Sequence, residues 1–216
     1  MLTAENLKGV WATVLLPVNR DGSVDFHCLA EELDILCRTQ VQGIYTNGTA
    51  AEFFNQSESE FDQIQVMAAE KCRKENIPFQ IGASHMSPVI CLERIKRTLS
   101  LKPDAYQIIL PDWLPPTTEE QIDFLLRVAE IADGTPLVLY NPGHAKRVLL
   151  PKDYYALQQA VPELIGIKTA AGDKIWFNEM RKYQHGLAIF IQGHRLATGI
   201  KQQVAHGSYS NMACFN

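Results

Sequence analysis

The sequence predicts most of a (β/α)₈ TIM barrel that occupies residues 1–216 as one domain, and three observations lead to this prediction. Eight short apolar runs recur along the chain, and an amphipathic helical pattern follows each of the first seven. Such alternation leaves two architectures, an open doubly wound sheet or a closed barrel. A nucleotide-binding sheet would carry a glycine-rich phosphate motif after its first strand, and neither GxGxxG nor GxxxxGK[ST] occurs.

The eight predicted strands are apolar throughout rather than alternating between apolar and polar residues. Continuous apolar runs are typical of parallel strands that are covered on both faces. The runs, of which the last is the weakest, span residues 10–18, 43–46, 79–83, 106–110, 137–140, 164–167, 188–191 and 209–215.

Several of the predicted helices have recognisable first residues. Phe26, Leu29 and Leu33 form the apolar stripe of the first helix, and residues 176–183 and 196–204 form the last two. Helix starts are indicated by capping-box spacing at Ser57 with Glu60 and at Thr118 with Gln121, by Ser87 before Pro88, and by Pro151.

The length of the chain bears on the completeness of the barrel. Barrels of this type typically have about 250 residues, whereas this chain has 216. The sequence ends inside or just after the eighth run, so we expect the helix that covers the eighth strand to be missing. Either the chain is truncated or another segment covers that face.

Composition excludes several classes of partner. The net charge is −4 with no long run of either sign, which favours neither nucleic acid nor an anionic membrane surface. No apolar run approaches the roughly 20 residues of a membrane helix, and the N-terminus lacks the apolar core of a signal peptide. The five cysteines form no CxxC pair and indicate reduced thiols. We therefore expect a soluble, cytoplasmic protein.

Lys168 is the strongest candidate for a catalytic residue. Barrel active sites lie at the C-terminal ends of the strands, and Lys168 directly follows the apolar run Leu-Ile-Gly-Ile. An ammonium group there is costly unless it is paired or deprotonated, and desolvation lowers a lysine pKa and exposes a nucleophilic amine. Such an amine can form a Schiff base with a keto acid. In the alternative interpretation, Lys168 extends to water or pairs with Asp173.

Two further places at the same end of the barrel can serve this chemistry. Tyr140 ends the fifth strand, and its hydroxyl can transfer a proton while an imine forms and breaks; alternatively, it is an aromatic residue of the barrel interior. The loop of residues 48–52, Gly-Thr-Ala-Ala-Glu, has small residues that let backbone N–H groups reach a carboxylate. In the alternative interpretation, the loop is an ordinary turn between a strand and a helix.

Together these motifs resemble the dihydrodipicolinate synthase / N-acetylneuraminate lyase family of Schiff-base barrels. Residues 48–52 are similar to the family's G-[TS]-T-G-E loop, residues 140–142 to its Y-N-x-P, and residues 166–173 to its G-x-K-x-[ST]-x-x-D. The resemblance runs from Gly9 to about Asn216. It implies a class I aldolase or lyase in which Lys168 attacks the ketone of pyruvate or another 2-oxo acid, without a cofactor or metal ion.

The resemblance also implies roles for other residues. Tyr140 would relay protons with the help of Thr49, and the substrate carboxylate would bind at Gly48, Thr49 and Ala50. Further substrate contacts would come from Trp113, where the synthases have a tyrosine, from His144, where they have an arginine, and from Met212. Members of the family have an additional helical C-terminal region, which we expect to be missing here. They usually assemble as homo-oligomers, so we expect a dimer or tetramer.

Three functions follow as hypotheses. The first is a Schiff-base aldolase or lyase, and the departures at Ala50, Trp113 and His144 favour an aldolase or lyase of another substituted 2-oxo acid over a dihydrodipicolinate synthase. The second is a sugar-acid dehydratase that uses the same imine. The third is a truncated barrel without catalytic activity.

Overall fold

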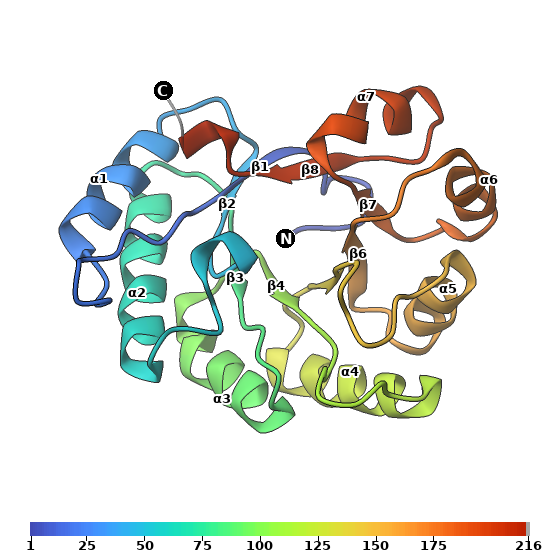
Figure 1. Ribbon diagram of the computed structural model, residues 1–216, viewed down its shortest axis with the longest axis horizontal. Coiled ribbons are helices and arrows are strands. Elements are labelled where there is room, and N and C mark those ends of the chain that lie inside the picture. The colour runs from blue at the N-terminus through green and yellow to red at the C-terminus, as the bar shows by residue number, and fades with distance from the viewer. Residues whose placement is uncertain (215–216) are drawn as a thin grey trace.

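A computed structural model, which describes residues 1–214, shows eight parallel strands in a closed barrel with the order β1 to β8 (Figure 1). Each strand pairs with its neighbours along the chain, and β8 closes the barrel against β1. Helices surround the strands, so the predicted (β/α)₈ architecture is confirmed. The strands are β1 (Gly9–Thr13), β2 (Gly43–Tyr45), β3 (Phe79–Gly82), β4 (Ala105–Ile108), β5 (Leu137–Asn141), β6 (Leu164–Thr169), β7 (Ala188–Phe190) and β8 (Gly207–Ser210).

The first and last strands differ most from their predicted bounds. β1 ends at Thr13, and residues 14–18 continue as loop rather than as strand. β8 begins two residues before the predicted run, at Gly207, where a Cβ atom would lie 2.2 Å from the carbonyl oxygen of Gly9. A glycine therefore permits the close approach that shuts the barrel. Met212–Cys214 form a short 3₁₀ helix, η3, and residue 215 of the predicted run lies outside the described residues.

Seven α-helices occur within residues 1–214, and none has the length and apolar character needed to cross a bilayer. The capping box at Ser57 and Glu60 is confirmed. The box of the fourth helix was predicted one residue too late, because the hydroxyl of Thr117 accepts from the Glu120 N–H at 3.2 Å. The helices are α1 (Phe26–Leu36), α2 (Glu58–Lys74), α3 (Pro88–Thr98), α4 (Thr118–Ala132), α5 (Pro151–Ala160), α6 (Lys174–Tyr183) and α7 (Gly193–Lys201).

A cluster of buried side chains closes the N-terminal end of the barrel. Trp11, Val138 and Phe190 point inward from three strands and pack with Leu7 of the segment that precedes β1. Leu2 packs against the same cluster, and in Figure 1 the N-terminus lies within the ring of strands. The interior of the barrel is therefore filled at this end, which is the end opposite to the one where barrel active sites lie.

Arg94 of α3 joins two loops at the C-terminal end of the barrel. Its side chain is 1% exposed, pairs with Glu58 at 2.7 Å, and donates to the carbonyl oxygen of Ser84 at 2.6 Å. Its guanidinium carbon also lies 4.5 Å from the centroid of the Phe61 ring. Since Ser84 follows β3 and Glu58 begins α2, this cation fixes the loop after β3 against the start of the second helix.

We expect Arg94→Met to lower the free energy of unfolding by about 3 kcal/mol, because a buried carbonyl loses its donor while the apolar packing is largely kept. For a chain of this size, that corresponds to a decrease of roughly 6–12 °C in the melting temperature. Differential scanning calorimetry checks it, with the exposed Lys96→Met of the same helix as the control. A melting temperature within 2 °C of the parent would contradict this role of Arg94.

Candidate active site

The side chain of Lys168 points into the barrel from β6 and is surrounded by aromatic rings. Its Nζ atom lies 4.1 Å from the ring centroid of Tyr140, 4.9 Å from that of Tyr45 and 5.3 Å from that of Tyr209. Within residues 1–214, no carboxylate pairs with this amine and no protein acceptor receives a hydrogen bond from it. Asp173, the alternative partner, instead caps α6 by accepting from the Trp176 N–H at 2.8 Å.

Burial lowers the pKa of Lys168 from its ordinary value near 10.5 to about 7. Desolvation is the cause, because rings replace water around the amine and no anion compensates for a positive charge. The residue as a whole still keeps some exposed surface. About half of the amines are therefore uncharged and nucleophilic at neutral pH, while a small molecule can still reach them.

The ring of Tyr140 lies next to Lys168 because their two strands are paired. Tyr140 of β5 is the register partner of Lys168 of β6, so both side chains point to the same side of the sheet. Neighbouring positions on parallel strands bring such side chains within contact distance. The sequence-predicted pair is thus brought together by the fold.

Tyr45 and Tyr209 also surround the amine, and neither was predicted from the sequence as a site residue. Burial raises the pKa of both phenols above the ordinary value. The hydroxyl of Tyr209 donates to Gln80 Oε1 at 2.7 Å, and the Tyr45 hydroxyl has no hydrogen-bond partner within the described residues. Both phenols therefore keep their protons near neutral pH. Each lies two residues after a glycine whose Cβ position faces a ring of the barrel interior, Trp11 for Gly43 and Phe190 for Gly207, so each points to the same side of its strand.

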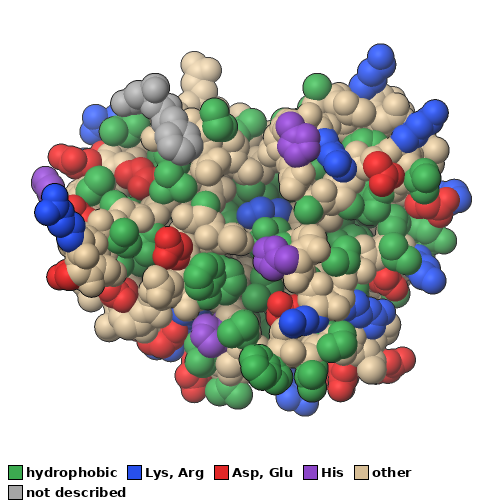
Figure 2. All heavy atoms as spheres, in the orientation of Figure 1, with side chains coloured by type: hydrophobic (Ala, Val, Ile, Leu, Met, Phe, Trp, Pro, Cys, Tyr) green, Lys and Arg blue, Asp and Glu red, His purple; other side chains and the backbone are tan. Residues whose placement is uncertain are grey.

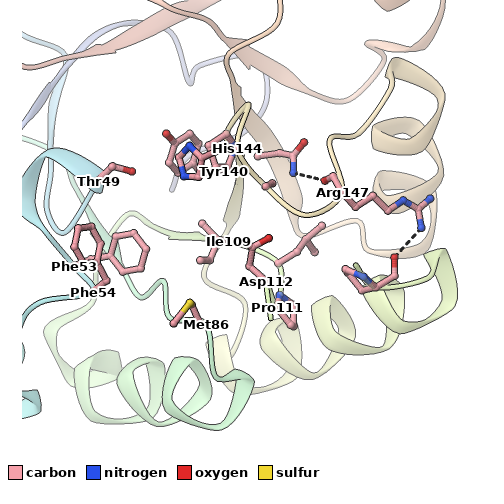
Figure 3. A pocket seen from close by; sticks show the side chains of 15 residues that line it. Thr49, Phe53, Phe54, Met86, Ile109, Pro111, Asp112, Tyr140, His144 and Arg147 are labelled. Carbon is pink, nitrogen blue, oxygen red and sulfur yellow. Dashed lines mark hydrogen bonds between the residues drawn. The ribbon is translucent and has the colours of Figure 1, made fainter. Parts of the chain in front are cut away.

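Two pockets meet at Tyr140. The smaller, of about 70 Å³, contains Lys168 and is also lined by Tyr209, Thr169 and Gln192. The larger, of about 200 Å³, is lined by Thr49 and by the loops after β3, β4 and β5 (Figure 3). Figure 2 shows a hollow near the centre of this face, bordered largely by hydrophobic side chains. The arrangement provides a reactive amine in an inner space and a separate outer space, with a phenol between them.

The loop after β2 lies beside the outer pocket. Gly48 is buried, and a Cβ atom there would lie 2.8 Å from the ring of Tyr45, so a side chain at this position would displace that ring. Thr49 lines the outer pocket, whereas Ala50 is exposed and lines neither pocket. Within residues 1–214 the backbone N–H groups of Thr49 and Ala50 have no acceptor.

Of the other residues predicted to contact the substrate, one lines the outer pocket and two lie outside both pockets. His144 is exposed but lines the outer pocket. Trp113 is 79% exposed and lies in a different groove, between the starts of α3 and α4. Met212 is 69% exposed in η3 and lines neither pocket. The fold thus brings Lys168, Tyr140, Thr49 and His144 around one hollow and leaves Trp113 and Met212 outside it.

No group of three or more histidine, cysteine, aspartate or glutamate side chains suited to a metal ion occurs in the described part of the chain.

Comparison with known proteins finds a match to the model of the dihydrodipicolinate synthetase family over residues 6–207. Among curated proteins, an N-acetylneuraminate lyase of Escherichia coli O1:K1 / APEC is 27% identical over 190 residues. The alignment covers 87% of this chain and 63% of that lyase, so the chain spans less than two thirds of this relative's length.

Solved structures share the fold. CdNal from Clostridium difficile, solved in complex with mannosamine, superposes with a TM-score of 0.88 at 21% identity, covering 98% of this chain and 72% of that chain. YagE, a prophage protein of Escherichia coli K12 solved in complex with pyruvate, gives a TM-score of 0.89 at 20% identity, with 97% and 72% covered. At these identities, the likeness shows only that the fold is shared.

Proposed function

This chain belongs to the dihydrodipicolinate synthetase family, and we propose that it forms or cleaves a carbon–carbon bond next to the keto group of pyruvate or a related 2-oxo acid. The observation that carries the proposal is the Lys168 amine, whose pKa is lowered to about 7 by burial among three tyrosine rings. An uncharged amine attacks a ketone, and loss of water gives an imine. The imine then withdraws electrons from the adjacent carbon–carbon bond.

Tyr140 supports this reaction by its position between the two pockets. Its ring is the nearest of the three to Lys168, and it alone among them also lines the outer pocket. We propose that its hydroxyl transfers protons while the imine forms and while the second carbonyl compound reacts. Thr49 lies on the same outer pocket and assists as a hydrogen-bonding group.

We propose that the keto acid's carboxylate binds at Gly48, Thr49 and Ala50. The unpaired backbone N–H groups of Thr49 and Ala50 support this assignment, since two such donors from one loop suit a carboxylate. A neutral hydrogen bond of this kind contributes about 1 kcal/mol, and one to a charged group contributes more. Trp113 and Met212 would reach the substrate only if their exposed loops moved, so we assign them no role in this step.

Reductive trapping tests the proposal directly. The protein is incubated with pyruvate and borohydride, and the reduced adduct is mapped by peptide mass spectrometry. We expect one adduct per chain on the peptide that contains Lys168. An adduct on a different lysine, or a protein that stays unmodified while a known Schiff-base aldolase is modified in parallel, would refute the assignment.

The rate of trapping is expected to depend on pH through the Lys168 amine. A pKa of about 7 means that the uncharged fraction rises nearly tenfold between pH 5 and 6 and levels off above about pH 8. Cyanoborohydride, which tolerates the acidic end of this range, gives the initial rate at each pH. A rate that keeps rising tenfold per unit up to pH 10 would instead indicate an ordinary, solvated lysine.

A further inference from the structure

The outer pocket differs chemically from the inner one, and this difference bears on the second substrate. Most of the side chains that line it are apolar, and the polar exceptions are Thr49, Asp112, Tyr140, Asn141, His144 and Arg147. Phe53 and Phe54 lie on one side and Ile109 and Pro111 on the other, with Met86 between them (Figure 3). The apolar side chains of this part offer no hydrogen bonds to hydroxyl groups, and burying a hydroxyl there without a partner costs free energy.

The charged side chains of the pocket are already engaged by the protein. Arg147 donates to the carbonyl oxygen of Pro116 and to Thr118 Oγ1, both at 2.9 Å, and its guanidinium is directed away from Tyr140 (Figure 3). Asp112 accepts from the backbone N–H of Lys146 at 2.7 Å. Asp153 also lies 3.7 Å from the Arg147 guanidinium, so a ligand carboxylate would compete with a carboxylate of the protein for this cation.

The polar groups that remain lie at the Tyr140 side of the pocket. Thr49 and Tyr140 carry hydroxyls there, and His144 is exposed beside them. This distribution suits a molecule with one polar atom at one end and an apolar body at the other. The pocket volume of about 200 Å³ also suits one aromatic ring, since a single benzene fills an apolar cavity of about 150 Å³.

We infer that the second substrate is an aldehyde with an apolar substituent of the size of one aromatic ring, rather than a polyhydroxylated aldehyde or one that carries a carboxylate. This inference rests on the proposed function of Lys168. The carbonyl group would face Tyr140 and Thr49, and the ring would contact Phe54, Met86 and Ile109.

The reaction balances without an oxidant or reductant. Pyruvate and Lys168 form an imine and release one water, and loss of a proton from C3 gives an enamine. C3 then bonds to the aldehyde carbon while the aldehyde oxygen takes up a proton. Hydrolysis of the imine consumes one water, frees Lys168 and releases a 4-hydroxy-2-oxo acid that bears the apolar substituent; cleavage is the reverse.

The test compares three aldehydes with pyruvate as the common partner: benzaldehyde, glyceraldehyde and succinic semialdehyde. Product formation is followed by chromatography and mass spectrometry. We expect kcat/KM for benzaldehyde to exceed both others by at least about tenfold, which is the discrimination that a few apolar contacts provide. Equal or lower kcat/KM for benzaldehyde, or no product from it, would overturn the inference.

A matched pair of variants connects the preference to the pocket. Phe54 is 61% exposed and Ile175 of α6 is 77% exposed, so serine at either position should leave folding intact. We expect Phe54→Ser to lower kcat/KM for benzaldehyde roughly five- to tenfold. The ratio of kcat/KM for benzaldehyde to that for glyceraldehyde should therefore decrease. We expect Ile175→Ser to change neither kcat/KM for benzaldehyde nor the ratio of the values for the two aldehydes. An unchanged preference in Phe54→Ser would contradict the assigned contact.

Trapping with pyruvate alone separates the two proposals. It needs no aldehyde, so it reports on Lys168 independently of the outer pocket. If trapping fails, the proposed function fails and this inference fails with it. If trapping succeeds and the polar aldehydes react as well as benzaldehyde, the function stands and only the inferred substrate class is wrong.

Discussion

Replacing Lys168 by arginine is expected to abolish the trapped adduct and to lower carbon–carbon bond formation by more than about a thousandfold, the scale on which removal of a covalent nucleophile acts. A guanidinium keeps its proton throughout the accessible pH range and cannot condense with a ketone. The Lys174→Met variant is the matched control, because Lys174 is an exposed lysine six residues further along the same chain. An adduct that persists in Lys168→Arg would remove the nucleophile from its assigned position.

The Lys168 amine also makes the free energy of unfolding depend on pH. The pKa of Lys168 is about 7 in the folded protein and near 10.4 in an unfolded chain. The unfolded chain therefore binds more protons between these values, so this group lowers stability fully below about pH 7 and ceases to do so as the pH rises past about 10. We expect Lys168→Met to be more stable than the parent at pH 6 by on the order of 5 kcal/mol. Urea unfolding at pH 6 and pH 9 measures the difference, which should shrink at the higher pH.

Replacing Tyr140 by phenylalanine is expected to lower turnover with pyruvate and an aldehyde by roughly 10²- to 10⁴-fold, the usual contribution of one positioned proton-transfer group. The ring stays in place beside Lys168 and only the hydroxyl is removed, so folding should be maintained. Imine trapping should slow as well, because water leaves more slowly without a proton donor. Steady-state kinetics and trapping rates measure both effects.

Tyr209→Phe is the matched control for the Tyr140 variant. Tyr209 also lies beside the amine, but its hydroxyl is already hydrogen-bonded to Gln80. We expect a loss of less than about tenfold, of the size that one neutral hydrogen bond explains. If Tyr209→Phe were as impaired as Tyr140→Phe, the proton relay would have to be shared or reassigned.

Much of the fold could be predicted from the sequence because the barrel repeats one periodic pattern. Buried parallel strands must be apolar on both faces, so even a three-residue strand such as β2 stands out within its run. The predicted bounds of the eighth strand were the least accurate, because Gly207–Ser210 consists of small and polar residues. Its position depends on how closely two backbones approach, which is a property of the closed barrel and not of any local pattern.

The candidate site was predictable only in part, for a related physical reason. Lys168 and Tyr140 lie in neighbouring strands whose register fixes the directions of both side chains. Tyr45 and Tyr209 come from strands far from Lys168 along the chain, and their approach to the amine follows only from closure of the barrel. Trp113 lies in a loop that no periodic pattern constrains, and the structure turns it toward solvent.

The buried cluster of Trp11, Val138 and Phe190 beneath the amine has a kinetic consequence. With that end closed, every reactant must enter and leave through a single mouth. The keto acid must reach the deeper position before the aldehyde occupies the space above it. We therefore expect an obligatory order, in which the keto acid binds before the aldehyde during condensation and leaves after the aldehyde during cleavage.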